Sequence, residues 1–438
     1  MRTRIRGGLL VDPATGMESR ADLYIENETI AELGNAGCDD RVDLEIDATD
    51  LVVCPGLIDL AVRFREPGFE HEASLESELA AAVAGGVTAV ACPPDMDPPL
   101  DEPGLVEMLT RRASMTALAS VHPLGALTRG LKGEKLAEMA ALSSAGCIAF
   151  SQDNRPIADL NVLYRAMQYA ATFGYPVWLR PQEPALSRGG VAHEGEVATR
   201  LGLPGIPAIA ETVAVASILL LARETGARVH LCRLSASHSV AMVREAKAQG
   251  ARVTCDVSAH HVHLSDVDIG YFDANCRLSP PLRGSRDREA LASGLADGTI
   301  DAICSDHSPV DSDGKEVPFS EADPGATGLE TLLSLAIRWG EARGLATALG
   351  PVTTGPARVL GLQPPRLAVG SAADLCVFDA NCWWRVEPKN LLSRGKNTPF
   401  NGYELQGQAC FTFVGGRLVF ERAGRGHRIR RAPHDQPN

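Results

Sequence analysis

The sequence lacks several features that would place the protein in particular classes. It has no apolar span approaching membrane length, and its N-terminus, MRTRIRGGLLVD, has no apolar stretch of signal-peptide length. It also has no basic excess, because 42 Lys and Arg face 55 Asp and Glu for a formal net charge of −13. Phosphate binding needs a basic surface, so the charge argues against a nucleic-acid partner. We expect a cytoplasmic protein with neither a membrane nor a nucleic-acid partner.

The eleven cysteines include no CxxC pair. Most of them stand next to apolar residues, as Cys54, Cys92, Cys147, Cys232, Cys255 and Cys304 do. This pattern is typical of buried, reduced thiols in a cytosolic protein.

The central part of the chain alternates apolar, strand-like runs with helical patterns. A length of 438 residues suits one large barrel with a second, smaller unit, and a hydrophobic content of 45% supports a sizeable core. Leu75–Ala84 and Thr212–Thr225 are predicted helices between strands. The strand-like runs are Leu57–Arg63, Val87–Cys92, Thr116–Val121, Cys147–Phe150, Val177–Arg180, Arg228–Arg233, Arg252–Val257 and Asp301–Ser305. Eight such βα units predict a TIM (β/α)8 barrel.

Both ends of the chain show short β patterns punctuated by Gly, Asn and Asp, with a hairpin turn expected at Gly415-Gly416. They predict a small β-sandwich built from the two ends. The expected division is residues 1–53 for the first part of the sandwich, 54–345 for the barrel, 346–422 for the second part of the sandwich, and 423–438 for a basic, flexible tail.

One stretch points to a known family. Residues 55–68 read PGLIDLAVRFREPG, a turn, a buried strand and a loop. The stretch resembles the signature of the amidohydrolase superfamily, and with REPG it is similar to dihydroorotase in particular. The resemblance extends to residues 396–400 (KNTPF). Its other motifs are Asn275 to Arg283 around the double proline, Asp306-His307-Ser308-Pro309 and Gly328-Leu329-Glu330-Thr331.

The resemblance implies a metal centre whose ligands are mostly absent from this sequence. In the family the first strand ends in His-x-His, and these histidines hold catalytic zinc. Here the same places are Ala61 and Arg63. A methyl group has no lone pair, and a guanidinium group stays protonated, so neither side chain can bind a metal.

Later strand ends repeat this pattern. The histidine expected at strand five is Arg180, and the metal-binding histidine of the strand-six motif, here His230 to Ser235, is Arg233. Asp153 keeps the place of the bridging ligand after strand four. Asp306 keeps the place of the strand-eight aspartate, which in the family is both ligand and general base. Four of six expected ligands are therefore missing, and we expect no metal, although active relatives carry zinc.

The substrate-binding residues implied by the family have also changed. Asp95 stands where an asparagine would hold the substrate carboxylate, and would repel it. Ser279 replaces the asparagine before the double proline, and Val310 replaces a histidine. Arg65 is kept and is a possible substrate-binding residue.

Some of these residues also have plainer interpretations. Asp306 and His307 could form a hydrogen-bonded pair at a strand end, and Asp153 could be an ion-pair partner for arginine. The run His260-His261-x-His263 looks like a metal cluster, but polar packing on a strand is favoured.

We therefore interpret the sequence as a catalytically inactive dihydroorotase homologue of pyrimidine biosynthesis. The resemblance implies that it is similar to the non-catalytic subunits that associate with aspartate transcarbamoylase, and we expect an oligomer. One alternative is an active dihydroorotase with an atypical metal site. Another is a non-catalytic binding module for an anion such as carbamoyl-aspartate.

The arginines at the strand ends suggest what fills the space of the lost metals. Arg63, Arg180 and Arg233 are predicted to place guanidinium groups there. At least one of the three should pair directly with each of Asp153 and Asp306. In the alternative arrangement these arginines point to solvent and water fills the space.

Overall fold

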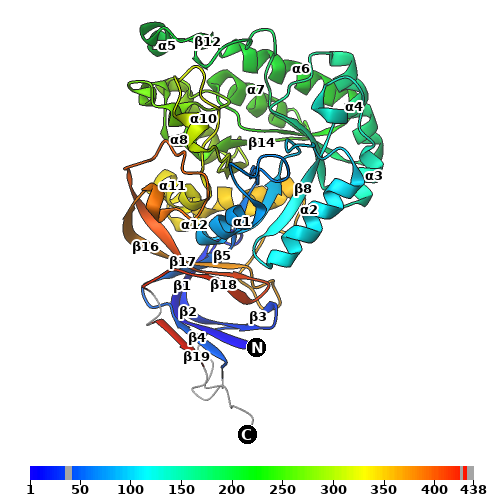
Figure 1. Cartoon of the computed structure of the whole chain (residues 1–438). Coiled ribbons are helices and arrows are strands. Elements are labelled where there is room, and N and C mark those ends of the chain that lie inside the picture. Colours follow the sequence, from blue (N-terminus) through cyan, green and yellow to red (C-terminus); the bar gives the residue numbers. More distant parts are fainter. Residues whose placement is uncertain (35–41, 425–427, 432–438) are drawn as a thin grey trace.

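The computed structural model describes residues 1–34, 42–424 and 428–431, and it contains an α/β barrel beside a separate sheet (Figure 1). Eight parallel strands pair in the order β15-β14-β13-β10-β9-β8-β7-β6. They are β6 (Leu57–Asp59), β7 (Val87–Cys92), β8 (Ser120–Ala126), β9 (Ala149–Asp153), β10 (Pro176–Leu179), β13 (Arg228–Leu231), β14 (Val253–Ser258) and β15 (Ala302–Cys304). The predicted TIM-barrel fold is confirmed.

The first and last strands of the barrel meet just beyond their carboxyl ends. The backbone N–H of Arg63 donates to the carbonyl of His307 at 3.0 Å, and the N–H of His307 donates to the carbonyl of Ala61 at 2.9 Å. The residues that follow β6 and β15 are thereby held together at the face where active sites form in such barrels.

Helices cover the outside of the barrel (Figure 1). The side chain of Ser74 caps α1 and Asp159 caps α4, and Gly85 and Gly174 end these two helices. The helices are α1 (Leu75–Ala84), α2 (Pro103–Thr116), α3 (Met139–Ser144), α4 (Leu160–Phe173), α5 (Glu196–Leu201), α6 (Ile209–Thr225), α7 (Ser237–Ala248), α8 (Ala259–His263), α9 (Ser285–Ala296), α10 (Ser312–Lys315), α11 (Leu332–Gly340), α12 (Leu345–Leu349) and α13 (Thr354–Leu360). Both predicted helices are confirmed, the second beginning three residues earlier than expected.

Two local predictions were wrong. The run Thr116–Val121 was expected to be a strand, but Thr116 ends α2 and the left-handed Ala117 (φ 55°) follows, so β8 begins only at Ser120. The histidine run was expected on a strand. It forms α8 instead, because the side chain of Ser258 accepts the N–H of His261 and starts a helix there.

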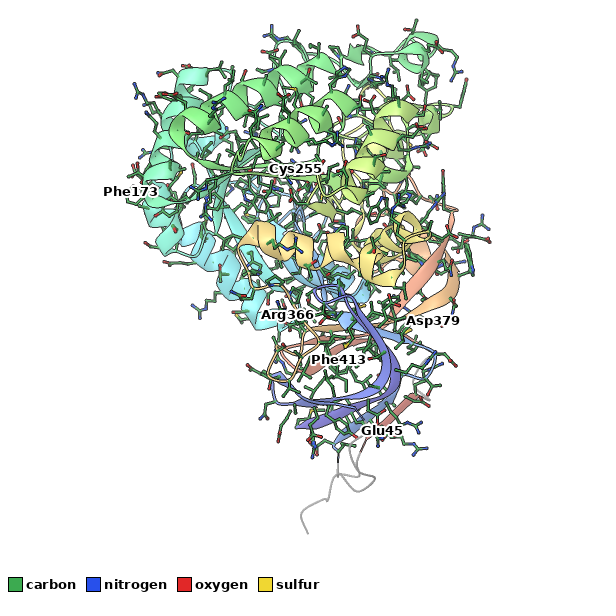
Figure 2. The ribbon with its side chains drawn as sticks, turned by 180° about the vertical axis from the view of Figure 1, so that it is seen from behind. Glu45, Phe173, Cys255, Arg366, Asp379 and Phe413 are labelled. Atoms are coloured by element: carbon green, nitrogen blue, oxygen red, sulfur yellow. The ribbon has the colours of Figure 1, made fainter. Side chains whose placement is uncertain are left out.

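The strands of both chain ends form one sheet of nine strands, separate from the barrel as predicted. They are β1 (Arg2–Asp12), β2 (Met17–Glu26), β3 (Thr29–Leu33), β4 (Leu44–Asp47), β5 (Val52–Pro55), β16 (Leu375–Arg385), β17 (Glu404–Val414), β18 (Arg417–Glu421) and β19 (Ile429–Arg431). Gly415 (φ 53°) and Gly416 (φ 71°) make the expected hairpin turn between β17 and β18. Phe413 lies in the core of this unit (Figure 2).

The prediction of a flexible tail is wrong for Ile429–Arg431, because these residues form β19, which pairs with β4 and extends the sheet. Residues 425–427 and 432–438 lie outside the described part, and the domain boundaries remain a prediction. A short two-stranded sheet, β11 (Ala192–His193) and β12 (Gly205–Ile206), lies in the loop after β10.

The ten cysteines within the described ranges are free thiols, and nine of them are buried, as the sequence predicted for them. None of the helices in those ranges is long and apolar enough to cross a membrane.

Candidate functional site at the carboxyl ends of the barrel strands

Four charged side chains converge where the barrel strands end. Arg63 follows β6, Asp153 ends β9, Arg233 follows β13 and Asp306 follows β15. The last three have left-handed backbones, with φ of 44°, 55° and 47°. This conformation costs a residue with a side chain on the order of 1 kcal/mol, and it is often retained at functional sites.

Arg63 contacts three carboxylates at once. Its Nη2 donates to both oxygens of Asp153, at 2.9 and 2.7 Å, and its Nη1 donates to Oδ1 of Asp306 at 3.1 Å. Its Nε donates to Oδ2 of Asp95 at 2.7 Å. The side chain is only 4% exposed, so the pairs are held out of water.

Arg233 approaches the same two carboxylates from the other side of the barrel. Its Nη2 lies 2.7 Å from Oδ1 of Asp153, and its Nη1 lies 3.2 Å from Oδ1 of Asp306. Each aspartate therefore pairs with both arginines, and the prediction that each pairs with at least one arginine is confirmed. We call Arg63, Asp95, Asp153, Arg233 and Asp306 the ion cluster.

Arg180, the third arginine, does not join the ion cluster. It is 7% exposed and makes no hydrogen bond or ion pair within the described ranges, where its Nε lacks a partner. Asp95 joins the cluster although the sequence reasoning placed it only in the substrate site. The signal that could have found it is its position after β7, which brings it to the same face as Arg63.

The charges of the ion cluster act on one another strongly. Burial alone would raise the pKa of Asp153, but the charges of Arg63 and Arg233 hold this pKa well below its usual range. Burial raises the pKa of Asp95. The charge of Arg63 lowers this pKa, and the charge of Asp153 raises it. Of these two carboxylates, Asp95 therefore takes up a proton more readily than Asp153.

The remaining predicted site residues surround the cluster without joining it. Ala61 is buried, and its carbonyl serves the barrel closure. Arg65 donates to Ser308 Oγ and to the carbonyl of Pro309, both at 2.9 Å, and its Nε lies 2.7 Å from the carboxylate of Glu72. These contacts engage its guanidinium group in the protein itself.

The other two changed substrate positions provide few polar groups. Val310 is buried, and its N–H donates to Oδ1 of Asn397 at 3.0 Å. Ser279 is half-buried on the loop before Pro280-Pro281. Beside Arg63 and Asp95 the remaining cavity is about 10 Å³, which holds about one water molecule.

Comparison with known proteins matches the chain to one family. A dihydro-orotase-like family model matches residues 50–239, and an amidohydrolase family model matches residues 192–419. A dihydroorotase from Pelotomaculum thermopropionicum is 43% identical over 430 residues, covering 96% of this chain and 99% of the relative. A dihydroorotase from Citrifermentans bemidjiense is 40% identical, and a dihydroorotase-like protein from Pseudomonas aeruginosa is 41% identical, each covering 96% of this chain and all of the relative.

The chain belongs to the dihydroorotase family.

Solved structures agree with this fold. The L-hydantoinase (dihydropyrimidinase) of Arthrobacter aurescens superposes with a TM-score of 0.84 at 23% identity, over 96% of both chains. The D-hydantoinase (dihydropyrimidinase) of Thermus sp. superposes with a TM-score of 0.80 at 22% identity, over 96% of this chain and 95% of that chain.

Relatives in the amidohydrolase family generally depend on a metal, and the ion cluster does not fit one. Asp153 and Asp306, the two kept carboxylates, are already bonded to guanidinium groups. Arg63 and Arg233 have no lone pair to offer and would repel a cation. We therefore assign no catalytic step to a metal at these residues.

A second group of ligand-type side chains lies deeper in this dihydroorotase homologue. His230, Cys232 and Asp256 bring ligand atoms within 4.8 Å of one another. His230 is already bonded, through Nδ1 to Thr254 and through Nε2 to Asp256, each at 2.9 Å. Burial holds the pKa of the Cys232 thiol well above its usual value. The group is therefore interpreted as hydrogen-bonded packing with a protonated thiol.

His307 is paired with Glu78 of α1 instead of Asp306, so the simple Asp306–His307 pair considered above is wrong. Its Nε2 lies 2.6 Å from the Glu78 carboxylate, which also accepts from Ser393 Oγ at 2.6 Å. Both His307 and Glu78 are fully buried. The pair ties α1 to the strand-eight loop and contributes no group to the ion cluster.

Polar packing explains two of the three histidines of α8. His261 bonds to Ser258 Oγ at 2.7 Å, and His263 bonds to the carbonyl of Leu335 at 2.8 Å. His260 stacks on Phe400, and within the described ranges neither of its ring nitrogens has a partner. Burial lowers the pKa of His260 to about 4, so its ring is neutral at pH 7.

Proposed function

We propose that this chain is a catalytically inactive dihydroorotase homologue of de novo pyrimidine biosynthesis that serves as a structural partner of aspartate transcarbamoylase. The observation that carries the first half is the ion cluster. Two guanidinium groups bond directly to both carboxylates kept from the family's metal centre. Without a metal, water keeps its high pKa and the main catalytic contribution is lost.

The partner half of the proposal is supported by what the chain retains. The barrel, its closure and the end sheet are intact around the ion cluster. A fold kept without its reaction suggests that its shape is used. The resemblance of the sequence to the non-catalytic subunits of this family supports aspartate transcarbamoylase as the partner, with assembly into a shared oligomer.

Co-expression with aspartate transcarbamoylase of the same organism tests the partner. We expect both chains to elute together in size-exclusion chromatography at about micromolar concentration, and transcarbamoylase assembly or stability to suffer when this chain is omitted. Two independent peaks, with a fully active transcarbamoylase alone, would contradict the proposal.

The names of the relatives favour one alternative. Several chains that are 40–43% identical are named dihydroorotase, so an active enzyme with a metal held by other residues must be tested. Metal content and turnover, measured together, separate the two functions. The binding-module alternative needs Arg63, Arg65, Arg180 and Arg233 to bind carbamoyl-aspartate together. It has less support, because Arg63, Arg65 and Arg233 are bonded within the protein.

A further inference from the structure

A cavity of about 160 Å³ lies beside the ion cluster, between the ends of β9 and β10 and the helices α4 and α6. Its wall is mostly apolar and includes Ile157, Leu160, Leu163, Leu179, Val213 and Ile218. Leu160 on α4 and Val213 on α6 are 50% and 39% exposed, so the cavity has an apolar rim that solvent reaches. Figure 1 shows these two helices on the outside of the barrel, on the side away from the end sheet.

Two buried polar side chains that line this cavity have unused donors. Arg180 is 7% exposed and bonds to nothing in the described ranges. Gln152 is 1% exposed; its Oε1 accepts from Thr128 at 2.9 Å, but its Nε2 has no partner there. Buried donors without partners are rare and costly, so each needs an explanation. A single acceptor group in the cavity would explain both.

The contacts of the charged groups leave Arg180 as the donor for an anion. Arg63 and Arg233 balance Asp153 and Asp306 through direct contacts. Asp95, the third carboxylate of the cluster, accepts from Arg63 Nε at 2.7 Å. Among the described residues Arg180 has no contact partner, and it borders a mostly apolar space. The charge of Arg233 repels it, and the carboxylates of Asp153, Asp306 and Glu211 attract it without a direct bond.

We propose that this cavity binds a small monocarboxylate with an apolar body, whose carboxylate bonds to Arg180 while its body packs between α4 and α6. A cavity of about 150 Å³ takes a benzene-sized molecule, so benzoate and branched carboxylates of similar size fit. The proposal does not depend on the transcarbamoylase partner or on the absence of zinc.

The lining also predicts what the cavity rejects. Asp153 and Glu183 border it, so a second negative charge on the ligand would meet carboxylates. A neutral amide would lose the charge-assisted hydrogen bonds to Arg180, which are about twice as strong as neutral ones. Benzoate should therefore bind better than either phthalate or benzamide.

Isothermal titration calorimetry of the full-length protein with these three compounds tests the proposal. We expect saturable binding of benzoate with a Kd of about 1 mM or tighter, and binding of the other two at least about tenfold weaker. Benzoate should also raise the thermal unfolding midpoint.

Matched variants locate the ligand. Arg180→Gln should weaken benzoate binding about tenfold or more, and Arg180→Lys should restore part of it. Ser217→Leu, which fills the cavity from α6 without changing charge, should abolish binding. Arg223→Gln removes an exposed arginine elsewhere on α6 and should leave the Kd unchanged.

The proposal is overturned if benzoate gives no saturable heat with the folded wild-type protein. It is equally overturned if Arg180→Gln and Ser217→Leu bind benzoate as the wild type does, or if benzamide binds as tightly as benzoate. Metal analysis and co-elution with transcarbamoylase are separate readouts, so failure here is distinguishable from failure of the proposed function.

Discussion

Asp306 and Arg180 are neighbours at the barrel mouth, but they differ in how their charges are compensated. Asp306 is bonded to two guanidinium groups, whereas Arg180 is a buried cation with no bond in the described ranges. Removing one partner of a buried ion pair leaves the charge of the other partner uncompensated, which lowers stability. Removing a buried charge that has no partner relieves the desolvation cost of that charge. Substitutions at the two positions should therefore change stability in opposite directions.

Asp306→Ala should lower the free energy of unfolding by roughly 3–5 kcal/mol, because Arg63 and Arg233 would each lose a buried partner. Denaturant unfolding measures this change. Arg244→Ala breaks an exposed pair between Arg244 and Asp297, whose side chains are 47% and 46% exposed, and should cost less than about 1 kcal/mol. Equal effects of the two substitutions would show that the ion cluster is not a stabilising network.

Arg180→Met should raise the free energy of unfolding by about 1–3 kcal/mol, since methionine packs against the apolar wall and needs no hydrogen bond. The same substitution at Arg63 should lower the free energy of unfolding, because Asp153 would lose its bonds to that guanidinium group. A loss of stability in Arg180→Met comparable to that in Arg63→Met would contradict the view that Arg180 is unpaired.

At the scale of residues, the sequence predicted that Asp153 and Asp306 would each pair with an arginine, but it did not predict where Arg180 lies. Parallel strands bring their carboxyl ends to one face, so opposite charges at those ends could be expected to meet. Which way an arginine turns depends on the local backbone and on the free space around it. Arg233 has a left-handed backbone, and Arg180 borders a cavity. Neither fact can be read from residue types.

At the scale of elements, Asp59 helps to hold the first strand of the barrel to the last. Its Oδ1 accepts from the N–H of Ala61 at 3.2 Å and from that of Ser305 at 3.0 Å, whereas its Oδ2 has no partner in the described ranges. Burial raises the pKa of Asp59 to about 6. The folded chain therefore holds this proton more strongly than the unfolded chain does.

This raised pKa predicts a pH dependence with a definite sign. The stabilisation from protonated Asp59 is fully present below about pH 4 and is lost as pH rises through 6, by roughly 3 kcal/mol in all. Asp59→Asn keeps an acceptor for the two N–H groups and removes the titration. The unfolding free energy of the variant relative to wild type should therefore increase between pH 4 and 7. A constant difference over that range would contradict the burial of an ionisable carboxyl group.

Element types followed from sequence better than element ends did. The hydrophobic runs predicted all eight barrel strands. The run Thr116–Val121, however, contains the end of α2 and the start of β8. Its start was misplaced because apolar residues near a boundary suit either a helix or a strand. The α8 helix was missed because its start depends on one side-chain cap by Ser258. Strand β19 was missed because its pairing partner, β4, is nearly the whole chain away in sequence.

At the scale of the whole molecule, we propose that an amidohydrolase fold remains while charge pairs replace its metal centre. Restoring the first-strand histidines alone, as Ala61→His with Arg63→His, should not restore dihydroorotase activity. Arg233 would still occupy the site and repel a cation, and Asp153 would still be bonded to it. A steady-state assay with dihydroorotate, with and without added zinc, checks this. Zinc-dependent turnover in this double variant would show that the remaining arginines do not block the metal.

The most direct test of the central claim is elemental analysis of the wild-type protein purified without chelator, combined with a turnover assay on the same sample. The account predicts zinc well below one ion per chain and no hydrolysis or formation of dihydroorotate, because guanidinium groups fill the place of the metal ligands. Zinc near one ion per chain or more, together with turnover that a chelator abolishes, would contradict it.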